Sequence, residues 1–110
     1  MKRIVLATAL VTALAAALPA LAATPTYKGT DGPGFTISMA SKPTKAGTIK
    51  LVIADKSNAH NFHLTGPGVN VKTSVSAVSV STLTVTLKKG TYTFICDPHA
   101  SFMKGSFTVK

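Results

Sequence analysis

Residues 91–103 read TYTFICDPHASFM, and in this stretch an alternating strand pattern runs directly into a group of side chains that bind soft metals. Aromatic residues and the cysteine occupy every second position from Tyr92 to Cys96, which is the period of a half-buried strand. His99 and Met103 follow within one short loop. The sequence therefore predicts a thiol, an imidazole and a thioether close to one another at the end of a strand.

These three side-chain types favour copper, because sulfur ligands hold Cu(I) and a thiolate with an imidazole still binds Cu(II). A second imidazole is available upstream, where residues 58–64 read NAHNFHL. In an extended segment His60 shares the inward face of Phe62, whereas His63 has the opposite parity and is expected to face outward. His60 is therefore the predicted ligand. The reverse assignment, with His63 as the ligand and His60 in a turn, remains the alternative.

Apolar residues recur at every second position in several segments of the chain, and no window of useful length shows the helical period of 3.6 residues. The segments lie within residues 35–39, 49–53, 62–64, 69–71, 78–87, 92–96 and 107–109. Glycine, proline, asparagine and aspartate separate them, as expected for turns. About seven short strands of this kind predict an all-β fold, an antiparallel Greek-key β-sandwich with inward apolar and outward polar residues.

Residues 1–22 are typical of a secretory signal, with two basic residues, an uncharged apolar run and a small-residue cleavage site. Cleavage is expected after Ala22 or Ala23 and would export the protein to a periplasm or to the extracellular space. An uncleaved membrane anchor is the alternative, because the apolar run is long enough to span a bilayer. Beyond the signal we expect a polar N-terminal lead-in over residues 23–30 and one domain over residues 31–110.

Cys96 is the only cysteine of the chain, which excludes an internal disulfide. Ligation to a metal would protect this thiol in an oxidising compartment, while simple burial as a small apolar residue is the alternative. The expected mature chain carries ten lysines against three aspartates, a net charge of about +7. This charge favours an acidic partner or a well-solvated surface, with membrane contact that is peripheral at most.

Several function classes are disfavoured by what the chain lacks. It contains no glutamate and three aspartates, too few for paired-carboxylate catalysis. No segment resembles the nucleophile elbow of a serine hydrolase. The expected mature chain has no arginine and no basic cluster interleaved with aromatic residues, so nucleic acid is a poor candidate partner. We therefore expect a binding or carrier protein and no enzyme.

Residues 90–99 (GTYTFICDPH) and residues 59–62 (AHNF) resemble two segments of the cupredoxins, the small blue copper proteins, in particular those of plastocyanin, amicyanin and pseudoazurin. The first segment resembles the strand that leads into the ligand loop, and the second resembles the upstream His-Asn step. The resemblance extends over residues 29–110. One departure is the three-residue spacer between His99 and Met103, which leaves the subfamily open.

The resemblance implies one copper ion per chain, cycling between Cu(I) and Cu(II). It also implies that His60, Cys96 and His99 form a trigonal plane of ligands and that Met103 is a weak axial ligand. Asn61 would link the upstream segment to the backbone beside Cys96 and hold the site together without the metal.

A one-electron carrier between redox proteins is the function that this resemblance implies, and we expect it to be monomeric. The expected electron route is the ring edge of His99, on an apolar docking surface formed by Phe35, Pro67, Pro98 and Ala100, while lysines attract an acidic partner. Alternatively, the residues around His99 only cap the core. A copper carrier or chaperone with the same ligands is the first alternative function, and a metal-free structural β-sandwich is the second.

Overall fold

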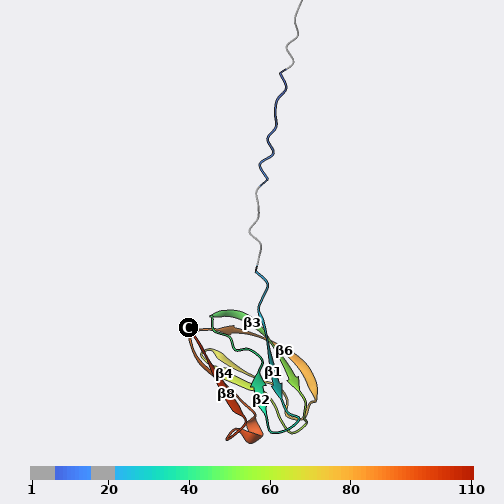
Figure 1. Ribbon diagram of the computed structural model, residues 1–110, viewed down its shortest axis with the longest axis vertical. Coiled ribbons are helices and arrows are strands. Elements are labelled where there is room, and N and C mark those ends of the chain that lie inside the picture. Colours follow the sequence, from blue (N-terminus) through green and yellow to red (C-terminus); the bar gives the residue numbers. More distant parts are fainter. Residues whose placement is uncertain (1–6, 16–21) are drawn as a thin grey trace, which may run out of the picture.

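The computed structural model of the protein describes residues 7–15 and 22–110. Residues 7–15 form neither helix nor strand, and the first strand begins at Thr26 (Figure 1). Apart from residues 7–15 and Ala22, the predicted secretory signal lies outside the described residues. Within the described ranges, no helix is long and apolar enough to cross a membrane.

Eight strands of the described chain form two four-stranded sheets (Figure 1). The first sheet has the strand order β2-β1-β3-β6, and the second has the order β5-β4-β7-β8. The strands are β1 (Thr26–Asp31), β2 (Ile37–Met39), β3 (Gly47–Asp55), β4 (His63–Gly66), β5 (Val69–Lys72), β6 (Ser79–Leu87), β7 (Gly90–Ile95) and β8 (Lys104–Val109). The predicted all-β sandwich is therefore confirmed, with one strand more than expected.

The structure corrects the prediction for residues 23–30, because most of this expected lead-in belongs to β1, an interior strand of the first sheet. β1 pairs in parallel with β3, from Thr26 beside Lys50 to Asp31 beside Asp55. The other strand pairs of the described chain are antiparallel, as expected. The folded domain thus begins several residues before the predicted boundary.

The apolar alternation that identifies the other strands is missing from β1, because Gly29 and Asp31 occupy its buried positions. Gly29 has a packing reason. A Cβ atom at this position would lie 2.7 Å from Ile53 Cδ1 and 2.8 Å from Phe62 Cε2. The glycine therefore lets the β1 backbone approach the core closely. Because it has no side chain, it also interrupts the apolar alternation by which the strand could be recognised in the sequence.

Aromatic stacking anchors β7 in the core of the sandwich. The ring of Phe94 stacks on Phe62 with the ring centroids 5.2 Å apart, and the ring of Tyr92 stacks on Phe107 at the same distance. Such aromatic pairs contribute roughly 0.5–1.5 kcal/mol each beyond the burial of their area. Because two inward side chains of β7 are held in this way, the position of Cys96 directly after the strand is well determined.

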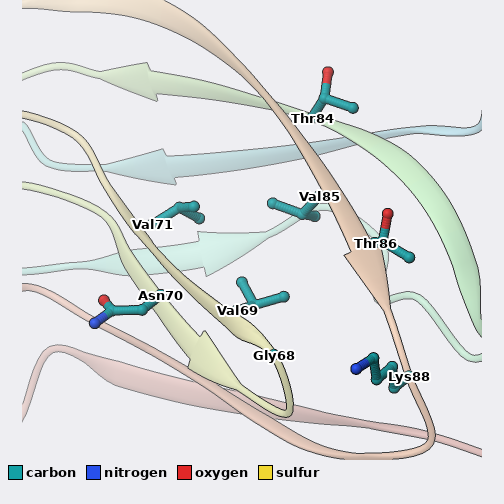
Figure 2. A pocket seen from close by; sticks show the side chains of 8 residues that line it. All are labelled: Gly68, Val69, Asn70, Val71, Thr84, Val85, Thr86 and Lys88. Atoms are coloured by element: carbon teal, nitrogen blue, oxygen red, sulfur yellow. The ribbon is translucent and has the colours of Figure 1, made fainter.

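The two sheets leave an open seam between their edge strands, β5 and β6. A groove of about 380 Å³ follows this seam (Figure 2), lined by Gly68, Val69, Asn70, Val71, Thr84, Val85, Thr86 and Lys88. These described lining residues include no histidine, cysteine or methionine, so the groove offers no soft metal ligand. The donor-rich loop after β7 is the stronger candidate for a functional site.

Candidate metal centre

Backbone hydrogen bonds close the loop after β7 on itself. The loop contains η1 (Asp97–His99), a short 3₁₀ turn with Pro98 near its start. Proline suits this position because its φ angle is already fixed, and because a backbone N–H in the first turn has no partner within the turn. The N–H of Cys96 donates to the Met103 carbonyl at 3.0 Å, the N–H of His99 donates to the Cys96 carbonyl at 3.0 Å, and the N–H of Met103 donates to the His99 carbonyl at 2.9 Å. These bonds bring together the three residues of the loop that could bind a metal, Cys96, His99 and Met103.

Three donor atoms from this loop and from the upstream segment form a nearly equilateral triangle. Cys96 Sγ lies 3.7 Å from His60 Nδ1 and 3.6 Å from His99 Nδ1. The two Nδ1 atoms lie 3.2 Å apart. A point at the centre of such a triangle is about 2 Å from each corner, which is the length of a metal–nitrogen bond in proteins. The three side chains therefore fit one metal ion held between them.

Met103, the predicted axial ligand, is buried within the same loop. Its backbone is tied to both Cys96 and His99 by the hydrogen bonds described above. A thiolate, two imidazoles and a thioether are a soft donor set that suits copper, whereas a thioether is a poor ligand for zinc. The donor chemistry of the site therefore fits copper.

His60 reaches the site from an irregular segment, because β4 begins only at His63. Three consecutive residues are buried there, His60, Asn61 and Phe62, with 3%, 1% and 0% of their surface exposed. A strand alternates its faces and cannot bury three consecutive side chains on one side. His60 does face inward as predicted, but the strand parity used to predict it does not apply to this segment.

The side chain of Asn61 joins this segment to the metal-binding loop. Its Oδ1 accepts a hydrogen bond from the backbone N–H of Asp97 at 2.8 Å. Its Nδ2 donates to Asp97 Oδ2 at 2.8 Å and to the Thr73 carbonyl at 3.2 Å. Asp97 directly follows Cys96, so these bonds hold the two histidine-bearing segments in register without any metal.

His63 takes no part in the three-donor cluster. Its Nδ1 lies 2.7 Å from Asp97 Oδ1, and its Nε2 lies 2.7 Å from Asn70 Oδ1. Burial lowers the pKa of His63, but the hydrogen bonds to Asp97 and Asn70 and the Asp97 charge raise it above its usual value overall. Conversely, burial raises the pKa of Asp97, while the hydrogen bonds from His63 and Asn61 lower it overall. His63, which was expected at the surface, is therefore hydrogen-bonded to Asp97 beside the three-donor cluster.

Two exposed phenylalanines flank the partly buried ring of His99. Phe35 is 65% exposed and Phe102 is 57% exposed. The Phe35 ring meets the His99 ring edge-on with centroids 5.0 Å apart, and the Phe102 ring lies 5.8 Å from that of Phe35 and 5.5 Å from that of His99. Phe102 is absent from the predicted docking residues. The signal available in the sequence was an aromatic residue between two of the predicted ligands, His99 and Met103.

The other residues of the predicted docking surface separate into two groups. Pro98 and Ala100 are exposed on the ligand loop beside His99. The prediction that Pro67 belongs to this surface is wrong, because Pro67 lies at the opposite end of β7. A Cβ atom at Gly90, the first residue of β7, would lie 2.7 Å from Pro67 Cγ, whereas the ligand loop follows the last residue of that strand.

Residues 5–109 match the family model described as a cupredoxin-like domain. Among solved structures, reduced rusticyanin is 25% identical, with 77% of this chain and 76% of that chain covered and a TM-score of 0.58. No curated protein sequence matches this chain.

Two further solved structures share the fold at lower identity. Auracyanin A, described as a "blue" copper protein from the green thermophilic photosynthetic bacterium Chloroflexus aurantiacus, is 16% identical, with 80% of this chain and all (100%) of that chain covered and a TM-score of 0.58. An oxidised amicyanin variant is 15% identical, with 84% and 87% covered and a TM-score of 0.52. Both align with most of this chain, so the similarity includes both sheets.

Proposed function

The chain belongs to the cupredoxin-like domain family, and from this premise we propose that it is an exported one-electron carrier with a mononuclear type 1 copper site. The family and the three-donor cluster support a blue copper protein with one copper ion. The single observation that carries the proposal is the triangle formed by Cys96 Sγ and the Nδ1 atoms of His60 and His99. The N-terminal segment that resembles a secretory signal supports export.

We assign His60, Cys96 and His99 as the three strong ligands and Met103 as the weak axial ligand. Copper bound there supplies a reversible one-electron couple between Cu(I) and Cu(II). The hydrogen bond that Asn61 Oδ1 accepts from the Asp97 N–H and the hydrogen bonds within the loop hold these side chains before any metal binds. Because the protein imposes the arrangement, little rearrangement is needed when the charge of the site changes, and this favours rapid electron transfer.

The exposed edge of the site supports a docking role for Phe35 and Phe102, with Pro98 and Ala100 at the rim. An apolar surface beside the His99 ring permits brief, close contact with a redox partner. The excess of lysines supports steering of an acidic partner toward it. We propose a carrier and no enzyme, since His60, Cys96 and His99 together form the three-donor cluster, and the sequence has no glutamate and three aspartates, too few for paired-carboxylate catalysis.

Absorption spectroscopy and voltammetry on the protein titrated with Cu(II) test this function. We expect an intense thiolate-to-Cu(II) band and a reversible couple in the parent. Cys96→Ser and His60→Ala should abolish the band, while the neighbouring change His63→Ala should leave a band in place. A band that persists in Cys96→Ser would refute the type 1 site. Tight Cu(I) binding without a reversible couple, with release to an acceptor, would instead identify a copper carrier.

A further inference from the structure

A chain of side-chain hydrogen bonds connects β4 to the metal centre through His63. His63 Nδ1 lies 2.7 Å from Asp97 Oδ1. The other carboxylate oxygen, Asp97 Oδ2, accepts from Asn61 Nδ2 at 2.8 Å, and Asn61 Oδ1 in turn accepts from the Asp97 N–H at 2.8 Å. Asn61 and His63, from one segment of the chain, therefore meet the distant ligand loop at Asp97, the residue directly after Cys96.

Both nitrogens of His63 face oxygen atoms. Nε2 lies 2.7 Å from Asn70 Oδ1 on β5, as Nδ1 does from the Asp97 carboxylate. The ring is thus fixed at both ends, and its orientation is determined by two neighbouring elements. A ring held in this way can fix the position of the carboxylate that it contacts.

Asp97 needs such a partner because it is the more exposed member of the pair. Without a donor on Oδ1, the carboxylate is free to rotate toward water, where hydration replaces its bond to Asn61. Asn61 Nδ2 would then keep only its longer bond to the Thr73 carbonyl, at 3.2 Å. The link between the His60 segment and the ligand loop would lose one of its two hydrogen bonds.

We propose that His63 is a positioning residue for the metal centre, which holds the Asp97 carboxylate against Asn61 and so keeps the His60 segment and the ligand loop at a fixed separation. The proposal deepens the copper-binding function and rests on it for its effect on the metal. The effect on the Asp97–Asn61 link is a property of the metal-free protein and does not depend on copper.

Three variants separate this role from general stability. His63→Leu removes both ring nitrogens and places an apolar side chain of similar size on β4. His63→Asn restores a nitrogen donor close to the place of Nδ1, the atom that contacts Asp97. Thr65→Val is the matched control, because Thr65 lies two residues further along β4 and pairs with Thr93 outside this hydrogen-bond chain.

The first measurement is hydrogen exchange of the Asp97 backbone amide in the metal-free protein. We expect exchange to be about tenfold faster in His63→Leu, close to the parent rate in His63→Asn and unchanged in Thr65→Val. The second measurement is the rate of copper loss to a chelator, since removal of a residue that orients ligands commonly costs about 10–100-fold in metal affinity. We expect the same order of variants, with copper loss about tenfold faster in His63→Leu.

An Asp97 amide rate in His63→Leu within twofold of the parent would overturn the proposal. It would equally be overturned if His63→Leu accelerated exchange uniformly across the sheet, or if Thr65→Val had the same effect, because either result indicates only lost stability. If the parent binds no copper, the proposed function fails, while the exchange measurement still decides the role of His63.

Discussion

Asp31 and Asp55 are register partners on the parallel strands β1 and β3, and both carboxyl groups are buried, with 0% and 3% of the residue surface exposed. Among the described residues, no hydrogen-bond partner reaches Asp31 Oδ1, Asp31 Oδ2 or Asp55 Oδ2. Burial, and after it the neighbouring Asp55 carboxyl group, raises the pKa of Asp31 to about 7. Two adjacent buried carboxyls cannot both be charged at low cost, so the pair keeps one proton.

This pair should make the metal-free protein less stable as pH rises from 4 to 7. Asp31 holds its proton up to a pKa of about 7 in the fold, but releases it near 3.8 when the chain unfolds. Between these values the folded state binds more protons, so the free energy of unfolding should fall by at most about 1.4 kcal/mol per pH unit. Denaturant unfolding at several pH values measures this slope, which should flatten above pH 7.

Asp31→Asn should abolish this slope between pH 4 and pH 6 and should stabilise the protein at pH 7.5, because an amide can donate to the Asp55 carboxylate at every pH. His63→Asn is the control. The raised pKa of His63 contributes stability below about 6.5 that is lost as pH rises through its folded pKa, so this variant should keep the slope at lower pH. A parent-like slope in Asp31→Asn would contradict the shared proton.

Gly29→Ala should destabilise the protein by roughly 1–3 kcal/mol, the usual cost of overpacking a core. The added Cβ would lie 2.7 Å from Ile53 Cδ1 and 2.8 Å from Phe62 Cε2, and neither side chain has open space behind it. Gly34→Ala is the matched control, since a Cβ there meets nothing within 4 Å. Equal unfolding midpoints for the two variants would show that β1 does not pack as described.

Phe102→Ser should slow electron self-exchange between copper-loaded molecules without changing stability. Phe102 is exposed beside His99, and the loss of an apolar docking contact worth about 1 kcal/mol corresponds to about fivefold in rate. Line broadening in nuclear magnetic resonance spectra of mixed Cu(I) and Cu(II) protein reports this rate. Val78→Ser, which changes an exposed apolar residue outside the ligand loop, should leave it unaltered. Equal slowing in both variants would argue against docking through this surface.

Ionic strength should change two electron-transfer rates in opposite directions. Molecules of the expected mature chain, with a net charge of about +7 once Lys2 and Arg3 are removed, repel one another, so self-exchange should accelerate as the screening length falls from about 30 Å at 0.01 M salt to about 8 Å at 0.15 M. Reduction by an acidic redox protein should instead slow over the same range, because attraction is screened. Stopped-flow kinetics at several salt concentrations measures the second rate, and a rate indifferent to salt would contradict steering by lysines.

The fold class follows from the sequence alone, because successive residues of a sandwich strand alternate between its buried and its exposed face. The pattern from Tyr92 to Cys96 is of this kind, and it places the thiol at the end of an inward-facing strand. The donor types and their order along the chain are likewise local facts. A cluster of His60, Cys96 and His99 could be expected from them, and the structure brings these three side chains together.

Features that depend on contacts between distant segments become evident in the folded molecule alone. The alternation pattern misses β1 because its buried positions hold Gly29 and Asp31. Gly29 leaves space for the side chains of Ile53 and Phe62, and Asp31 is the register partner of Asp55 on β3. Three further features depend on such contacts: the irregular path before β4, the hydrogen bond between His63 and Asp97, and the placement of Pro67 at the far end of β7. Strand register and side-chain packing set these positions, and neither quantity is contained in the periodicity of a single segment.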